Sequence, residues 1–161
     1  MPYGHNYWFL LCAPDGWTLN NSIGKEQGIQ AVFYPTGSSW TAAQQSGTFM
    51  YYTASDKKDE NATVPRVMAD DADKVKREVQ SAVVKIGEPI KVGGLAVPVQ
   101  LFVPGGFSRF ETVAYIDSPK VIIMFVMTSE NEAAFKRDYE AFVHLVQSYE
   151  FMGTEVTVEK K

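Results

Sequence analysis

The clearest periodic pattern in the chain lies near its C-terminal end. Apolar and aromatic residues recur there at steps of three and four residues, which places them on one face of a helix. These residues are Phe135, Tyr139, Phe142, Val146 and Tyr149. The segment Ser129-Glu130-Asn131-Glu132 precedes them and has the capping-box pattern, in which Ser129 and Glu132 satisfy free backbone N–H groups. We expect this aromatic face to cover a sheet.

A second helix is predicted from about Thr63 to Val83, because its apolar positions again recur at helical spacing. The apolar stripe consists of Val64, Met68, Ala72, Val75, Val79 and Ala82. Thr63 is the expected N-cap, and Pro65 is tolerated in the first turn. The acidic segment Asp70-Asp71-Ala72-Asp73 is interpreted as a solvated helix face, since it lacks the glycine and the distal glutamate of a calcium loop.

The other apolar segments alternate with a period near two or are continuously apolar, as strands are. They are Tyr7–Ala13, Ile29–Tyr34, Thr48–Thr53, Leu95–Val103, Arg109–Ile116 and Val121–Thr128. The last of them has no polar alternation up to Met127, so we expect it at the centre of the sheet, covered on both faces. Pro98 cannot donate a ladder hydrogen bond, which predicts an edge or a bulge in its segment.

The links between the later strands are short, which predicts antiparallel neighbours. Residues 104–108 join two of the strands, and residues 117–120 join the next two. The order of three strands, a helix, three or four strands and a helix is typical of an α+β fold with a mainly antiparallel sheet. No linker divides the chain, so we expect one domain over residues 1–161, with a core of about 7–151 and a frayed C-terminal tail.

Composition places the chain among ordinary globular proteins. It has 161 residues, of which 45% are hydrophobic and 21% charged, and a net charge of −4. A chain of this kind is not disordered, and it offers no broad basic surface to nucleic acid or anionic lipid. No apolar run approaches the roughly 20 residues of a membrane-spanning helix. The single cysteine, Cys12, excludes an internal disulfide and is interpreted as a small buried residue.

The sequence contains no catalytic signature that we recognise. Neither a nucleophile elbow nor a phosphate-binding loop is present. Of the two histidines, His5 lies near the start of the chain, and His144 is expected on the exposed side of its helix, paired weakly with Glu140. Glu111 and Asp117 are interpreted as an exposed cross-strand charge arrangement. We therefore predict no enzyme activity, no metal site and no cofactor.

Two short motifs resemble those of the PsbP-like family. Ala13-Pro14-Asp15-Gly16-Trp17 follows the first predicted strand, as in the opening of that family, and Leu145-Val146-Gln147-Ser148-Tyr149-Glu150-Phe151 is similar to its closing helix. The resemblance implies an α/β/α sandwich with a central sheet of about six or seven strands and two main helices. It also implies a non-enzymatic binding or assembly module that is exported, to the periplasm for example, with the cytoplasm as the alternative location.

Aromatic residues in predicted loops are the best candidates for contact with an unknown protein partner. Trp40 follows a polar turn, and Phe107 follows Gly105-Gly106 and stands beside Arg109. Each aromatic ring either packs onto its own domain or is exposed for contact with a partner. We take Trp40, Phe107 and Arg109 as the candidate partner-binding residues. A small-molecule carrier with a pocket between the sheet and a helix is the alternative, and an enzyme with scattered site residues is a third possibility.

Overall fold

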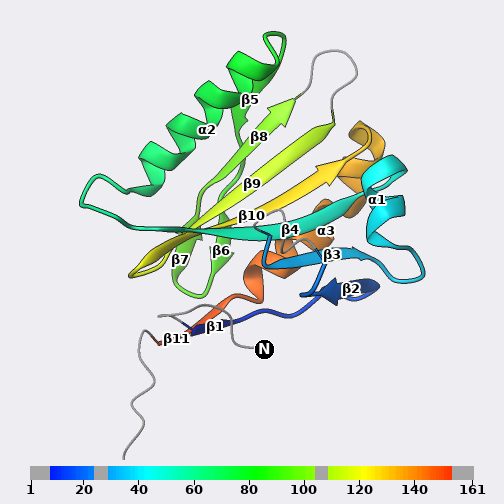
Figure 1. Ribbon diagram of the computed structural model, residues 1–161, viewed down its shortest axis with the longest axis horizontal. Helices are drawn as coiled ribbons and strands as arrows, with labels where there is room; N and C mark the ends of the chain where they lie inside the picture. Colours follow the sequence, from blue (N-terminus) through cyan, green and yellow to red (C-terminus); the bar gives the residue numbers. More distant parts are fainter. Residues whose placement is uncertain (1–7, 24–28, 104–108, 154–161) are drawn as a thin grey trace, which may run out of the picture.

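The fold is built on a seven-stranded antiparallel sheet with the strand order β2-β3-β4-β10-β9-β8-β5 (Figure 1). The computed structural model describes residues 8–23, 29–103 and 109–153. The strands of the sheet are β2 (Trp17–Asn20), β3 (Ala31–Pro35), β4 (Phe49–Asp56), β5 (Val83–Ile86), β8 (Val99–Val103), β9 (Phe110–Asp117) and β10 (Val121–Ser129). The α+β class and the antiparallel sheet are therefore as the sequence predicted.

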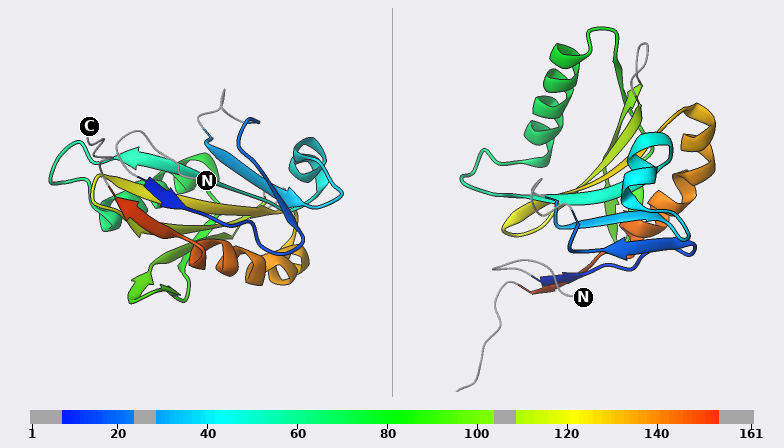
Figure 2. Two further views of the ribbon diagram at one scale, coloured as in Figure 1. Left: turned by 90° about the horizontal axis from the view of Figure 1, so that it is seen from below. Right: turned by 45° about the vertical axis from the view of Figure 1, so that its right-hand side comes forward.

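Helices lie on both faces of this sheet (Figure 2). The helix α2 (Val64–Glu78) covers one face and α3 (Glu132–Gln147) covers the other. A short helix, α1 (Trp40–Ser46), connects β3 to β4 and was not predicted from the sequence. Layers of helix, sheet and helix make an α/β/α sandwich, as the resemblance implied.

The central strand β10 shows how the two faces are filled. It is the fourth of the seven strands, which confirms the expectation from its continuously apolar sequence. Ile123, Phe125 and Met127 point into a large cluster under α3, which we call the α3-side core. Ile122 and Val126 point into a smaller cluster under α2, the α2-side core. Side chains on the two faces of β10 thus belong to two hydrophobic cores of unequal size.

The face of α3 is apolar as its periodicity predicts. Phe142 and Val146 are fully buried, and Phe135, Tyr139 and Tyr149 are partly buried against the α3-side core. Phe135, Tyr139 and Phe142 follow one another along the helix with ring centroids 5.4 and 6.0 Å apart. The helix therefore rests on the sheet through a continuous row of aromatic rings.

The N-terminus of α3 differs from the sequence prediction. Its N-cap is Asn131, whose Oδ1 accepts a hydrogen bond from the backbone N–H of Ala134 at 2.9 Å. Ser129 is instead the last residue of β10, where it pairs with Phe110 and its Oγ accepts from the hydroxyl of Thr48. The capping-box assignment was wrong because the strand ladder continues one residue further than predicted, through Ser129, and the N-cap lies two residues later.

The helix α2 begins where the sequence predicts and ends earlier. Thr63 is the N-cap, and its hydroxyl accepts from the backbone N–H of Arg66. The helix ends at Glu78, because the backbone of Val79 is extended and the chain turns back to form β5. The predicted end at Val83 was too late, since residues 83–86 pair with β8 in the sheet.

The predicted strand 95–103 is divided at Pro98. Residues before the proline form β7 (Leu95–Val97), which pairs with β6 (Ile90–Val92) in a separate hairpin. Gly93 turns this hairpin with a φ of 59°, a conformation that glycine adopts without strain. Residues after the proline form β8 inside the main sheet, so Pro98 marks a break between two sheets.

The ends of the described chain meet in a second small sheet. There β1 (Trp8–Leu10) pairs antiparallel with β11 (Glu150–Gly153). Cys12 follows β1 and is exposed, which corrects the expectation that it is buried. Its backbone N–H donates to Ser148 Oγ at 3.0 Å, so the segment is held at the surface by polar contacts. The frayed tail was expected after Phe151, but residues 152 and 153 belong to β11, and the rest of it, residues 154–161, lies outside the described residues.

Candidate binding site between α2 and the sheet

A cavity of about 630 Å³ lies between α2 and the sheet. Val75 and Val79 face it from the helix side. Its apolar wall on the sheet side is formed by Phe102, Val113, Met124 and Val126. The strand β4 adds Tyr51 and Thr53, so four strands and one helix line a space that opens to solvent, has largely apolar walls and carries a few polar groups.

The cavity exists because the second half of α2 packs on the α2-side core through Val75 alone, whereas the first half packs through several residues. Val64 is the one helix residue that is buried, and Val67 and Met68 pack beside it against the α2-side core. Further along, the helix presents the short side chains of Val75 and Val79. Valine side chains on both walls are too small to fill the space beneath the second half of the helix.

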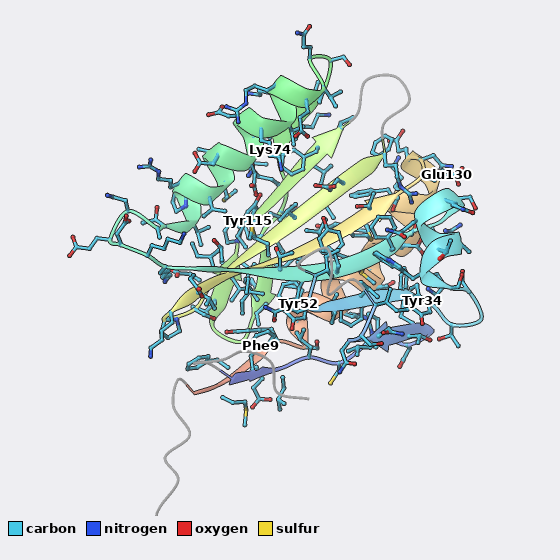
Figure 3. All side chains as sticks on the ribbon, in the orientation of Figure 1. Phe9, Tyr34, Tyr52, Lys74, Tyr115 and Glu130 are labelled. Carbon is cyan, nitrogen blue, oxygen red and sulfur yellow. The ribbon has the colours of Figure 1, made fainter. Side chains whose placement is uncertain are left out.

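A buried polar network fixes the middle of α2 to the sheet. The amide of Gln100 on β8 donates to the carbonyl of Met68 at 2.9 Å and to the hydroxyl of Tyr115 at 3.1 Å. The Tyr115 hydroxyl in turn donates to Asp71 Oδ2 at 2.8 Å. Figure 3 shows Tyr115 on the sheet below the helix that carries Lys74. We call Gln100, Tyr115 and Asp71 the polar anchor of α2.

Two carboxyl groups and a phenol face the cavity in a poorly solvated environment. Burial and the nearby carboxylate of Asp71 raise the pKa of Glu111, although a hydrogen bond from Thr128 partly offsets the shift. Burial also raises the pKa of Asp71, against the opposing effect of the Tyr115 hydroxyl. The pKa of Tyr51 is raised by burial and by both carboxylates. These groups therefore favour their uncharged forms more than they would in water.

Exposed charged groups lie where the cavity meets solvent. Lys74 and Glu78 line it from α2 and are both exposed. Arg109 lines it from the start of β9 and is partly buried. The cavity thus has an apolar interior, two desolvated carboxyls and a mixed charged rim.

Comparison with solved structures identifies the architecture. The solution structure of cyanobacterial PsbP (CyanoP) from Synechocystis sp. PCC 6803 matches with a TM-score of 0.56 at 15% sequence identity. The match covers 94% of this chain and 92% of that one. The chain has a PsbP-like fold. No protein-family model matches the sequence, and no curated protein does so either.

Of the three predicted partner-contact residues, Arg109 lines the cavity and Trp40 is not among its lining residues. Trp40 is 6% exposed, and its ring packs edge-on against Phe49 with centroids 4.8 Å apart. Of the two alternatives for this ring, its burial supports the one in which it packs onto its own domain, and a role of Trp40 in partner binding stays a prediction. Phe107 lies outside the described residues, so its contact with a partner stays a prediction.

Arg109 holds the C-terminal end of α1. Its guanidinium donates to the carbonyls of Ala43, Gln44 and Gly47, with Nη1 2.6 Å from the Gln44 oxygen. The same group lies 5.0 Å from the centroid of the Phe49 ring. A cation suits the negative end of a helix dipole, so the structure gives Arg109 a clear structural role. Its role in partner binding stays a prediction.

The acidic residues of the cavity were misinterpreted from the sequence. Glu111 was expected in an exposed cross-strand arrangement, but α2 covers its face of β9 and leaves it partly buried. Asp71 was expected on a solvated helix face, but it accepts the bond from Tyr115. Asp117, by contrast, is exposed and pairs with Lys57. Gln100 within the apolar segment 99–103 was the one sequence signal of a buried polar network, and it was missed.

One histidine lies among the described residues. His144 is exposed on α3, with Nε2 3.9 Å from Glu140 Oε1, as the helical spacing predicted. Across residues 8–23, 29–103 and 109–153, His, Cys, Asp and Glu side chains do not gather in groups that could hold a metal ion. In the same residues, no helix has the length and apolar character needed to cross a membrane.

Proposed function

We propose that this protein is a non-enzymatic binding module that carries a small molecule in the cavity between α2 and the sheet. This proposal rests on the cavity itself, which has a volume of about 630 Å³ and mostly apolar walls. Ligand pockets in proteins typically measure roughly 300–1,000 Å³ and combine apolar walls with a few polar groups. Of the functions considered from the sequence, the carrier is the one that such a cavity favours.

The polar groups around the cavity support binding rather than catalysis. The hydroxyl of Tyr115 and the carboxylate of Asp71 hold each other and fix α2. The described histidine, His144, lies exposed on α3, the helix on the opposite face of the sheet. A nucleophile activated by a neighbouring base, which covalent catalysis requires, is not found among the described residues that line the cavity.

Filling the cavity tests this proposal. The variant Val75→Phe places a larger ring in the space from the helix side, and Ala69→Phe adds the same ring on the exposed side of α2 as a control. Both proteins are screened by ligand-observed NMR against small aromatic and aliphatic compounds of positive, zero and negative charge. We expect compounds that bind the wild type and Ala69→Phe and lose binding to Val75→Phe. Absence of any binder, or equal binding to all three proteins, would refute the proposal.

A second function, the binding of a partner protein, is favoured by the edge of the sheet. The edge strand β5 exposes Val83 and Ile86, which are 50% and 73% accessible to solvent. Exposed edge strands can accept a strand from another chain. In this case a partner isolated with the wild type should be lost with Ile86→Lys, while small-molecule binding stays unchanged.

Export of the protein is proposed from the resemblance of its two motifs to the PsbP-like family. Fractionation of the native host tests it. Recovery of the unprocessed chain from the cytosol would leave the cytoplasm as the correct location.

A further inference from the structure

We propose that the ligand of the cavity is an organic cation, an amine or quaternary ammonium group attached to an apolar body. This inference rests on the proposed carrier function and names the class of its ligand. It follows from the sign of the buried charge, the nature of the walls and the position of the competing cations.

The carboxyl groups outnumber the free cations around the cavity. Asp71 and Glu78 face it from α2, and Glu111 faces it from β9. Arg109 also lines it, but its guanidinium is engaged by three carbonyl groups at the end of α1. Lys74 and Glu78 are both exposed, so water and salt screen their charges. The less exposed groups are Asp71 and Glu111 against Arg109, so carboxyl groups still outnumber cations inside the cavity.

The two least solvated carboxyls are only partly compensated by a cation, because Lys74 lowers the pKa of each while burial raises it by more. Asp71 and Glu111 are close enough to interact, and the carboxylate of Asp71 raises the pKa of Glu111. Each receives a hydrogen bond from a neutral hydroxyl, from Tyr115 and from Thr128 respectively. A buried carboxylate is stabilised most effectively by a positive charge. An ammonium group between them would offset both the desolvation and the mutual repulsion.

The remaining walls suit the rest of such a molecule. The side chains of Tyr51 and Phe102 line the cavity, and aromatic rings attract quaternary ammonium groups through their electron-rich faces. Val113, Met124 and Val126 provide an apolar surface for a hydrocarbon body. An anion of the same size would meet three carboxyl groups against two cations and should bind less tightly.

The experiment compares three probes with similar apolar bodies and different charge. Benzyltrimethylammonium, benzyl alcohol and benzoate are titrated into the full chain, and binding is followed by calorimetry and ligand-observed NMR. We expect benzyltrimethylammonium to bind most tightly and benzoate least. Glu111→Gln should lower the affinity for benzyltrimethylammonium by about tenfold, which corresponds to about 1.4 kcal/mol, and leave the affinity for benzyl alcohol unchanged. The control Glu140→Gln changes an exposed carboxyl on α3 and should change nothing.

The pH dependence provides a second readout, because a quaternary ammonium does not titrate. The affinity of the protein for benzyltrimethylammonium should fall as the pH is lowered, since protonation of Asp71 and Glu111 removes their negative charge. The fall should begin above the ordinary range of carboxyl groups, because the pKa values of Asp71 and Glu111 are raised. In that pH range binding should also release protons, so the measured heat should depend on the buffer. The titratable groups facing the cavity are Tyr51, Asp71, Lys74, Glu78, Arg109 and Glu111.

The outcomes separate this inference from the carrier function on which it rests. If benzyl alcohol or benzoate binds as tightly as the cation and loses binding in Val75→Phe, the carrier function stands and the cationic ligand is wrong. If the cation binds equally well to the wild type, Val75→Phe and Glu111→Gln, it binds elsewhere, and the inference is overturned. If no probe in the wider screen binds the wild type, both proposals fail.

Discussion

Replacement of Tyr115 by phenylalanine should loosen α2 from the sheet at a single point. Tyr115 is fully buried, and the change removes only the hydroxyl that donates to Asp71 at 2.8 Å and accepts from Gln100 at 3.1 Å. A hydrogen bond to a charged group contributes about 1.5–3 kcal/mol. Gln100 keeps its bond to Met68, so we expect a loss of about 2 kcal/mol. For a chain of 161 residues this lowers the Tm by about 4–8 °C.

The dependence of this loss on pH identifies the bond. The hydroxyl donates most strongly to Asp71 when that carboxyl is ionised, and this bond lowers the pKa of Asp71 against the larger effect of burial. The difference in unfolding free energy between wild type and Tyr115→Phe should therefore be largest above the pKa of Asp71. It should shrink as the pH falls through that value. Urea unfolding followed by circular dichroism at several pH values measures it.

Tyr139→Phe serves as the matched control, because Tyr139 is partly buried on α3 and lies outside the polar anchor. We expect its unfolding free energy to stay within about 0.5 kcal/mol of the wild type. A Tyr115→Phe protein as stable as the wild type above the pKa of Asp71 would refute the reasoning. A loss that does not vary with pH would show that the hydroxyl acts through packing alone.

Three further changes test other parts of the structure. Phe142→Ala should lower the unfolding free energy by about 3–5 kcal/mol, because it empties a fully buried site, and an unchanged urea midpoint would contradict the packing of α3. Glu111→Gln should stabilise the protein at neutral pH, because the raised pKa of Glu111 means that stability is lost as the pH rises through it. In acid, where Glu111 is protonated, that gain in Tm should disappear. Arg109→Ala should cost about 2 kcal/mol by releasing the end of α1, and Arg109→Lys should recover only part of it in the same unfolding assay.

Long periodic or continuous apolar segments could be predicted from the sequence because burial alone determines them. The stripe through Phe142 and Val146 identifies α3, and the unbroken run 121–127 identifies the central strand. Short elements carry too little pattern for such a prediction. The helix α1 spans seven residues, about two turns, and β5 only four, so neither repeats its apolar positions often enough to be recognised.

The candidate site could not be predicted because it depends on which helix covers which face. Alternation along β9 places Arg109, Glu111 and Val113 on one side, and the structure confirms that all three line the cavity. Whether that side is exposed depends on the position of α2, which local sequence does not determine. The N-cap of α3 is a similar case, since Ser129 and Asn131 are both good caps and only the length of β10 decides between them.

The polar anchor divides α2 into two parts that should differ in local unfolding. The residues up to Asp71 are held by several contacts with the α2-side core and by the Gln100 and Tyr115 bonds, whereas the turns after it contact that core through Val75 and line the cavity. Backbone amides in the last turns should therefore exchange with deuterium through a small local opening, and those in the first turns only through a larger one. A ligand would add contacts to the weaker half alone. Slower exchange confined to residues 72–78 would then report occupancy of the cavity without any knowledge of what occupies it.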